Sequence, residues 1–335
     1  MSRATVSRVI AGSGYVSDEK RKLIEVAIAD LGYRPHALAR GLRSNRSDIF
    51  GAVVVDVSSP FYAQMLGGIQ RGAKAAGKSV LSVSGHAVAE DEAHAIVELL
   101  DRACDGLILY LENQLRPDVV ALIAKSHIPV VTIGGNEFPA ATVRIHIDNA
   151  GGARDAMAHV LAQGHRAITY LSGGLKYRDT HDRLRGMAAA LKEQNLTLDD
   201  IHIEHGDFIE TFGYEATQRL LASGRRVTAI FAGDDDVAAG ALLALKHAGK
   251  RVPEDISLVG YDDNFHARHL TPGLTTVRQP VDEVGRLAAE LLCRLVAGET
   301  IAETEITVPT QLVVRQSVGQ VLSASLSKET TELAR

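Results

Sequence analysis

The chain has 335 residues, of which 46% are hydrophobic and 30 are glycine, so it is long enough to bury cores in two or three domains. Its formal net charge of −5 is unevenly divided, because residues 1–46 carry +5 and the remainder carries −10. No apolar run reaches the roughly 18 residues of a membrane helix, no export pattern follows Met1, and Cys104 and Cys293 form neither a disulfide framework nor a zinc motif, so we expect a cytoplasmic chain.

The first predicted elements are two basic helices. The sequence predicts a helix over Ser2–Ile10, a break at 12–14, and a second helix from Ser17 to Leu31 that opens with the capping sequence SDEK. Nine Lys and Arg residues stand against four acidic residues in 1–46. Such a basic segment favours a nucleic-acid partner, since side chains that neutralise phosphates release condensed counterions. An ordinary solvated charged face is the alternative.

From Asp48 onward, short apolar runs alternate with longer amphipathic stretches, which is typical of βα units built on parallel sheets. The predicted strands are 50–56, 79–84, 106–110, 130–133, 167–172, 229–232 and 257–261. The predicted helices are 63–77, 89–102, 150–164, 183–194, 214–223, 237–249 and 284–297. We therefore expect two successive wound sheets with a cleft between them that accepts a small molecule.

The rest of the sequence predicts a β-rich segment over 305–315 and a Ser/Thr/Glu-rich tail from Ser323. Neither GxGxxG after a strand, nor GxxxxGK[ST], nor GxSxG occurs, so the sequence offers no support for a nucleotide cofactor. We expect no cofactor and no enzymatic activity. The three adjacent acids at 234–236 do not predict a metal site, because consecutive residues cannot all face one ion.

Motifs spread along nearly the whole chain resemble one family. The segment SRATVSRVI, the turn GSGYVS and the stretch LGYRPHALARGLRSNRS resemble the DNA-binding head of the lac repressor/galactose repressor (LacI/GalR) family. The resemblance continues, in one order, through GAVVVDVSSPFYAQMLGGIQ, DGLILY, IPVVTIGG, GHRAITYLSG, AGDDDVAAGALLALKHAG and VPEDISLVGYDDN. The chain is therefore identified as similar to this family.

The resemblance implies an α/β fold of the periplasmic-binding-protein-like type I, with two doubly wound parallel-sheet lobes preceded by a partial helical DNA-binding head. The implied domains are a head and hinge helix over 1–46, an N-terminal lobe over 48–147 plus 279–305, a C-terminal lobe over 148–278 plus 306–320, and a flexible tail over 321–335. Three crossovers are expected to join the lobes.

By the same resemblance, the helix near the start of the chain reads DNA. Arg3, Ala4 and Arg8 fall at base-contacting positions, with Thr5 and Ser7 near phosphates. Arginine forms bidentate hydrogen bonds to guanine, and hydroxyl groups bind phosphate oxygens. An ordinary amphipathic helix is the alternative.

Two further expectations concern the head. The stretch 35–45 resembles the family's hinge helix, in which Leu42 corresponds to a leucine that enters the minor groove and kinks the duplex, and a linker helix with one buried leucine is the alternative. Family members begin with one more helix, the first of the helix-turn-helix, which is missing ahead of Ser2. Without that packing partner a short recognition helix is marginal, so we expect weak operator binding from either a misassigned start or a truncation.

Carried over residue by residue, the effector site of the family falls on eight positions. These are Phe61, Tyr62, His146, Arg183, Phe208, Asp234, Asp262 and Gln279. Such side chains suit a hydroxyl-rich ligand. Core packing is the alternative for Phe61, and helix capping is the alternative for Asp234. Two carboxylates with one arginine favour a neutral sugar or polyol over a phosphorylated one, with a sugar acid held by Arg183 and His146 as an alternative.

The implied function is that of a homodimeric, ligand-responsive transcriptional repressor of a carbohydrate-utilisation operon, which binds a pseudo-palindromic operator. Ligand binding between the lobes shifts DNA affinity only through different affinities for two lobe arrangements. A cytosolic sugar-binding protein without DNA binding is the alternative if the head is incomplete. The basic head speaks against an exported solute-binding protein, and the lack of a nucleophile–base pair or phosphate loop speaks against an enzyme.

Overall fold

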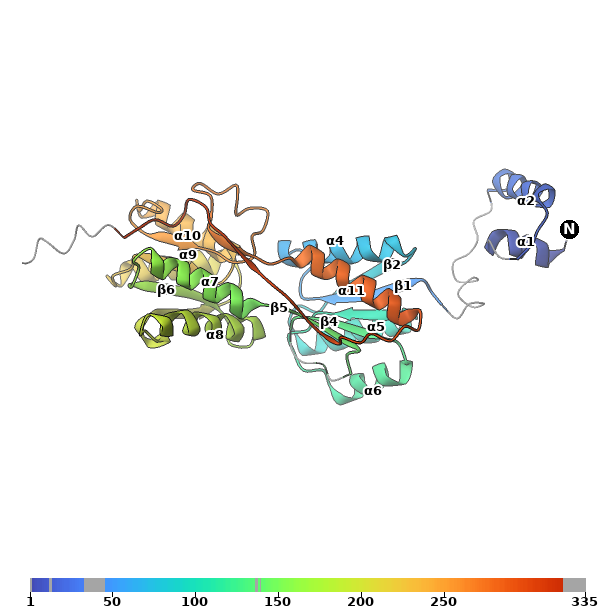
Figure 1. Ribbon diagram of the computed structural model, residues 1–335, viewed down its shortest axis with the longest axis horizontal. Helices are drawn as coiled ribbons and strands as arrows, with labels where there is room; N and C mark the ends of the chain where they lie inside the picture. The colour runs from blue at the N-terminus through green and yellow to red at the C-terminus, as the bar shows by residue number, and fades with distance from the viewer. Residues whose placement is uncertain (1, 12–13, 33–45, 136–137, 139, 322–335) are drawn as a thin grey trace, which may run out of the picture.

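The computed structural model describes residues 2–11, 14–32, 46–135, 138 and 140–321, which form a small helical head and two α/β lobes (Figure 1). The head consists of α1 (Arg3–Ala11) and α2 (Asp18–Asp30), which contact one another. Val16 and Ile24 are buried in it. Within the described ranges, no helix combines the length and the apolar composition that crossing a bilayer requires.

The first lobe is built on a six-stranded parallel sheet in the order β11-β5-β4-β3-β1-β2. Its strands are β1 (Ile49–Val54), β2 (Ser79–Ser84), β3 (Gly106–Leu109), β4 (Val130–Ile133), β5 (Val143–Ile147) and β11 (Glu305–Val308). One face packs against helices α4 (Pro60–Ala75) and α11 (Val281–Val296), and the other against α5 (Ala89–Asp101) and α6 (Pro117–Ser126).

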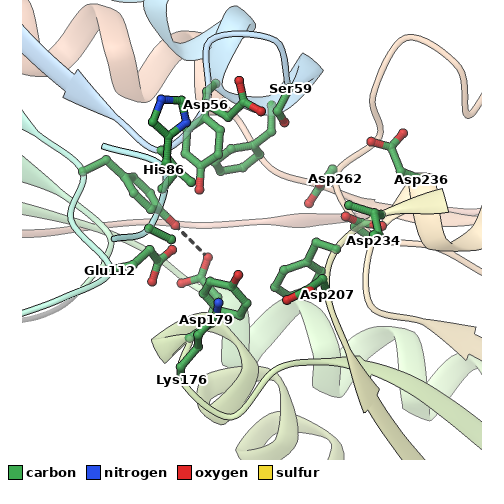
Figure 2. A pocket seen from close by; sticks show the side chains of 18 of the residues that line it. Asp56, Ser59, His86, Glu112, Lys176, Asp179, Asp207, Asp234, Asp236 and Asp262 are labelled. Carbon is green, nitrogen blue, oxygen red and sulfur yellow. Dashed lines mark hydrogen bonds between the residues drawn. The ribbon is translucent and has the colours of Figure 1, made fainter. Parts of the chain in front are cut away.

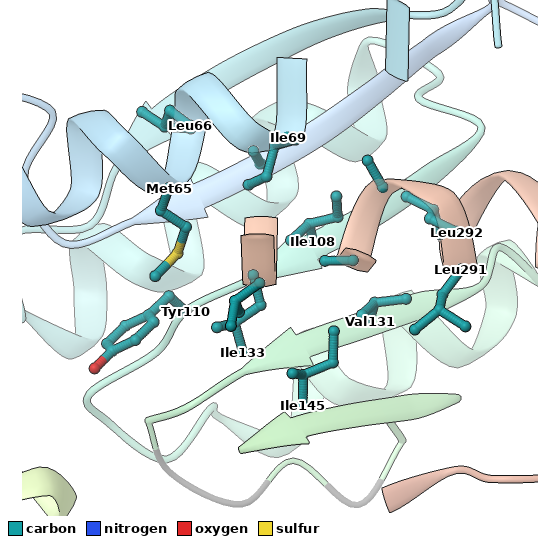
Figure 3. Packing of buried hydrophobic residues seen from close by; sticks show 14 of the residues in the cluster. Met65, Leu66, Ile69, Ile108, Tyr110, Val131, Ile133, Ile145, Leu291 and Leu292 are labelled. Carbon is teal, nitrogen blue, oxygen red and sulfur yellow. The ribbon is translucent and has the colours of Figure 1, made fainter. Parts of the chain in front are cut away.

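Strand β1 divides its side chains between two cores because successive residues of a strand point to opposite faces. Phe50 and Val54 belong to the core under α4 and α11, whereas Val53 belongs to the core under α5 and α6. Figure 3 shows the first of these cores, in which Met65 of α4 and Leu292 of α11 pack over the sheet. Helices thus cover both faces, as the uninterrupted apolar strands of a parallel sheet require.

Helices α4 and α11 approach each other closely at two glycines. A Cβ atom on Gly68 would overlap the backbone carbonyl of Asp282, and a Cβ atom on Gly285 would overlap the carbonyl of Met65. Glycine at both positions lets the two backbones come together without side chains between them. The core of the first lobe is therefore completed by α11, a helix that follows the whole second lobe in sequence.

The second lobe has a four-stranded parallel sheet in the order β7-β6-β8-β9. Its strands are β6 (Ile168–Gly173), β7 (His202–Gly206), β8 (Ala229–Ala232) and β9 (Ser257–Val259). Helices α7 (Asn149–Ala162) and α8 (Arg178–Glu193) cover one face, and α9 (Glu210–Ala222) and α10 (Asp235–His247) cover the other. A 3-10 turn, η1 (Leu198–Asp200), precedes β7, and β10 (Thr276–Arg278) pairs antiparallel with β12 (Gln311–Val313) beside this lobe.

Three segments join the lobes, as the sequence predicts (Figure 1). The chain crosses from β5 through Asp148 into α7, from β10 through Gln279 and Pro280 into α11, and from β11 into β12. The first and third segments are linked, because the Asp148 amide donates to the Val308 carbonyl at 2.9 Å and the Thr310 hydroxyl donates to the Asp148 carbonyl at 3.0 Å. Two of the three segments that connect the lobes are therefore hydrogen-bonded to each other.

The α/β architecture with two parallel-sheet lobes confirms the predicted fold class. Each strand and helix predicted for the body overlaps one in the structure. The sequence reading misses β5, β7, β10 and α6.

Candidate functional site

A cavity of about 420 Å³ lies between the two lobes and is lined by both (Figure 2). The first lobe contributes residues that follow strands, such as Asp56 after β1, and Tyr110 and Glu112 after β3. The second contributes residues from the start of α8 and from segments that follow β7, β8 and β9. Ligands of parallel α/β sheets bind outside the carboxyl ends of the strands, so both sheets present their binding edge to this cavity.

Arg183 on α8 is the buried cation of the cavity. Its side chain is 4% exposed, its Nε donates to Asn149 Oδ1 at 2.9 Å, and it donates a second hydrogen bond to the Gly233 carbonyl. Its Nη2 lies 3.9 Å from an oxygen of Asp179 and 3.8 Å from one of Asp262. The guanidinium is thus fixed by five neighbours that include the Tyr261 ring, whose centroid lies 3.9 Å away.

Asp234 and Asp262 line the cavity on the side of the second lobe (Figure 2). Asp234 is the N-cap of α10, and its Oδ1 accepts from the Val237 amide at 2.7 Å, so it caps the helix while it faces the cavity. Asp262 follows β9 with a positive φ of 108°, and its Oδ1 accepts from Gln279 Nε2 at 2.6 Å. Gln279 is not itself a lining residue, and it reaches the site through Asp262.

Burial shapes the protonation of the acidic side chains in this cavity. It is the main cause that raises the pKa of Asp234 to about 7 and that of Asp262 to about 8, while Arg183 lowers both. Burial, with the charge of Asp179, also raises the pKa of Glu112 to about 8. Burial therefore favours the protonated form of these carboxyl groups.

Aromatic rings form part of both walls. Phe61, Tyr62 and Tyr110 contact one another edge to face, with centroid distances of 5.0 Å for the first pair and 5.2 Å for the two tyrosines. On the second lobe, the Tyr177 and Phe208 rings are 5.4 Å apart. All five line the cavity, so Phe61 both packs against the core of the first lobe and faces the site.

The remaining predicted site residues lie elsewhere. His146 of β5 is not among the described residues that line the cavity, and its ring Nε2 lies 2.8 Å from a carboxylate oxygen of Glu305 on β11. Ala4, Thr5, Ser7 and Arg8 lie on α1, whose bounds include Arg3. Leu42 lies outside the described residues.

The sequence reading did not single out Tyr110, Glu112, Asp179 or Asp236, which also line the cavity. Two signals could have found them. Tyr110 is the last residue of a predicted strand and Glu112 lies just beyond it, and Asp179 stands four residues before Arg183 on one helix face. Asp236 is the last of the three adjacent acids at 234–236, and its Oδ1 accepts from Asn264 Nδ2 at 3.2 Å.

The chain is similar to known proteins along nearly its whole length. Residues 1–36 match the family described as "Bacterial regulatory proteins, lacI family", and residues 157–318 match "Periplasmic binding protein-like domain". The chain is 32% identical over 318 residues to catabolite control protein A of Priestia megaterium, covering 95% of this chain and 96% of that protein. The chain belongs to the LacI family. It is thus a DNA-binding transcription regulator with a helix-turn-helix head and a periplasmic-binding-protein-like body.

Two solved structures place this LacI-family chain among ligand-bound regulators. One is a lac repressor dimer bound to operator and the anti-inducer ONPF, with a TM-score of 0.85, 27% identity, and coverage of 95% of this chain and 96% of that one. The other is a complex of the transcriptional regulator CelR with cellobiose, with a TM-score of 0.73, 32% identity and the same coverage.

Proposed function

We propose that this LacI-family chain is a cytoplasmic, homodimeric repressor of a carbohydrate-utilisation operon, and that its effector is a sugar or polyol bound between the lobes. One observation carries the proposal. The cavity opens where the lobes meet, and buried Arg183 brings Asp179 and Asp262 together at its wall. A ligand there touches both lobes at once, so its affinity depends on how the lobes are arranged.

The lining chemistry supports a hydroxyl-rich effector. Carboxylates accept hydrogen bonds from neighbouring hydroxyl groups, and Arg183 donates them. Aromatic rings on both walls offer flat surfaces to a sugar ring. The CelR structure holds cellobiose, and this similarity at 32% identity favours a carbohydrate for the present chain as well.

The proposed coupling to DNA runs through the lobes. An effector that prefers one lobe arrangement changes operator affinity by the ratio of its affinities for the two arrangements. On the head, Arg3, Ala4 and Arg8 of α1 are proposed to face bases, and Thr5 and Ser7 phosphates. Leu42 is proposed as the minor-groove wedge. A pseudo-palindromic operator follows from the two-fold symmetry of a homodimer.

The effector half of the proposal is tested by thermal unfolding against neutral sugars, polyols, sugar acids and sugar phosphates. A ligand that binds only the folded chain stabilises it by RT ln(1 + [L]/Kd) and so raises the midpoint. Arg183→Ala should abolish the shift, because it removes the buried guanidinium. Arg185→Ala is the matched control, since Arg185 lies on the same helix, is 68% exposed and pairs only with Asp182 among the described residues. If the ligand shifts the thermal midpoint of the Arg183 variant as much as that of the parent chain, the effector binds elsewhere.

The DNA half is tested by fluorescence anisotropy with an operator fragment, in the presence and absence of the stabilising ligand. Arg8→Ala should weaken operator binding, while Lys192→Ala at the end of α8 should leave it unchanged. Equal operator affinity with and without the ligand would reduce the proposed function to ligand binding alone.

A further inference from the structure

The charges around the cavity are out of balance. Seven lining residues are acidic, namely Asp56, Glu112, Asp179, Asp207, Asp234, Asp236 and Asp262 (Figure 2). Among the described residues that line the cavity, Lys176 and Arg183 bear the permanent positive charges, and His86 is the remaining basic group. An excess of carboxyl groups over cations around one cavity favours a ligand that supplies positive charge.

The guanidinium of Arg183 is already surrounded by groups of the protein. Its guanidinium contacts Asn149, the Gly233 carbonyl, Asp179 and Asp262, so it stays at the wall of the second lobe. Lys176 is exposed and lies on the other side of the cavity with Glu112 and Asp179 (Figure 2). Asp234, Asp236 and Asp262 form a separate group, which we call the acidic wall.

Part of the acidic wall has a structural role, which limits how many carboxylates can serve a ligand. Asp234 caps α10, and helix N-termini favour negative charge. Both carboxylate oxygens of the neighbouring Asp235 accept hydrogen bonds inside the lobe, one from Thr276 Oγ1 at 2.6 Å and one from the Asn264 amide at 2.8 Å. Asp262 and Asp236 each accept a hydrogen bond at Oδ1, from Gln279 and Asn264 respectively, and both carboxylates also line the cavity.

Asp262 is held in place by a residue outside the cavity lining. Gln279 is 4% exposed, and its Nε2 donates to Asp262 Oδ1 at 2.6 Å. Gln279 does not line the cavity, so Asp262 is the member of this pair that a ligand meets. An ammonium group suits such a carboxylate, because it is a donor only, with three N–H bonds and no acceptor.

The aromatic walls fit the same kind of ligand. Phe61, Tyr62 and Tyr110 line one side of the cavity, and Tyr177 and Phe208 line the other. The faces of aromatic rings attract cations, and rings combined with carboxylates are a common way to bind amines.

We propose that the effector carries a basic nitrogen, as an amino sugar or a polyhydroxylated amine does, and that its ammonium group binds the acidic wall of Asp234, Asp236 and Asp262. This inference rests on the proposed function, because it names the chemical class of the ligand for the same cavity. Binding of such a ligand releases protons near neutral pH, since carboxyl groups held protonated by burial ionise beside the ammonium.

The test compares matched hexoses by isothermal titration calorimetry on the full chain: each neutral hexose, its 2-amino-2-deoxy form and its N-acetylated form. The amino form should bind at least tenfold more tightly than the other two. Titrations in two buffers of different ionisation enthalpy should show proton release for the amino form only. Asp236→Asn should weaken the amino form about tenfold and the neutral hexose much less, whereas Asp101→Asn, at an exposed residue of α5 that does not line the cavity, should change neither.

Each other outcome overturns the inference in a recognisable way. A neutral hexose that binds as tightly as its amino form, in a manner sensitive to Arg183→Ala, refutes the basic nitrogen and leaves the proposed carbohydrate effector standing. Amines that bind without proton release, or with no loss in the Asp236 variant, refute the acidic wall as their site. An absence of binding by every amino form refutes the inference, and operator binding that no hexose changes also contradicts the proposed function.

Discussion

Tyr110 of the first lobe donates a hydrogen bond of 3.0 Å to Asp179 Oδ2 of the second lobe, directly across the ligand cavity (Figure 2). Tyr110 follows β3, and Asp179 lies in the first turn of α8. Asp179 is also 3.9 Å from Arg183, so one carboxylate connects the first lobe to the buried arginine. The bond can exist only while the lobes are close, and it therefore reports on closure.

Tyr110→Phe should loosen this closure. The variant keeps the buried ring and removes only the hydroxyl that Asp179 accepts from. A hydrogen bond to a charged group contributes ~2 kcal/mol, so urea unfolding should show a loss of about that size. Small-angle X-ray scattering should show a larger radius of gyration without ligand. Tyr15→Phe, on a tyrosine that is 90% exposed, is the control, and equal effects of the two variants would refute the role of the bond.

Stability should fall as pH rises through neutrality, partly because of Glu112. Its pKa is raised to about 8 in the folded chain, mainly by burial, and is ~4.3 when unfolded. The folded state thus binds the extra proton, so the stability this carboxyl contributes is complete below pH ~4.3 and is lost as pH rises through about 8. In urea titrations, the free energy of unfolding of the parent chain should fall between pH 5 and 8.5. Glu112→Gln should make this fall smaller by on the order of 2 kcal/mol, a figure that is reduced because Glu112 is partly accessible to water.

Glu98→Gln is the comparison for the pH experiment, because Glu98 is exposed and pairs with Arg102 on the same helix. This change should leave the slope of stability against pH as it is in the parent chain. An unchanged slope in the Glu112 variant would mean that its carboxyl ionises in the folded chain as it does in water.

Neighbouring glycines of α4 should respond in opposite ways to alanine. Gly68→Ala places a methyl group against the Asp282 carbonyl of α11 and should destabilise by ~3 kcal/mol through forced separation of the helices. Gly67→Ala meets only the flexible Arg71 side chain and should be neutral or gain ~0.5 kcal/mol from helix propensity. Thermal unfolding of both measures this, and similar midpoints would contradict the close crossing of α4 and α11.

Thr310→Val should loosen the hinge without opening a core. The hydroxyl donates to the Asp148 carbonyl at 3.0 Å, and this bond links the first and third crossovers. Its loss should cost ~1 kcal/mol and speed hydrogen–deuterium exchange in peptides that contain the crossovers. Thr307→Val, on an exposed residue of β11, should leave exchange unchanged. Equal exchange in both variants would show that the crossovers move independently.

The elements that sequence reasoning found are those with uniform apolar runs. β3 and β4 are buried at every position, so their sequences GLIL and VVTI carry a clear signal. β7, HIEHG, lies at the edge of its sheet and is only partly buried, which permits two histidines and a glutamate in a strand. Edge strands of this kind lack the pattern that predicts them.

β5 carries the alternating apolar and polar pattern of a half-buried strand but is only five residues long, and it also explains the position of His146. Its sequence VRIHI alternates buried and half-buried residues, and both polar residues pair with Glu305 on the neighbouring β11. The partner lies 159 residues away from His146 in the chain, so no local pattern could reveal it. A histidine that resemblance placed near the effector instead contacts Glu305 on the neighbouring strand, outside the cavity lining.

The candidate site was predictable in part. Phe61, Arg183 and Asp262 were expected from resemblance, and all three line the cavity. Tyr110 and Asp179 could not be paired from sequence, because the hydrogen bond between them depends on how two separately folded lobes face each other. The excess of acidic side chains around the cavity likewise appears only when both lobes are brought together.

The order in which the chain is made sets when the first lobe can finish folding. Its sheet needs β11 at one edge, and its core needs α11 over α4, yet both follow the second lobe in the chain. A growing chain on the ribosome therefore carries an incomplete first lobe, with an apolar face of α4 and an unpaired strand edge at β5, until the second lobe has emerged. This interval during synthesis is when the protein is most open to aggregation and most dependent on chaperones.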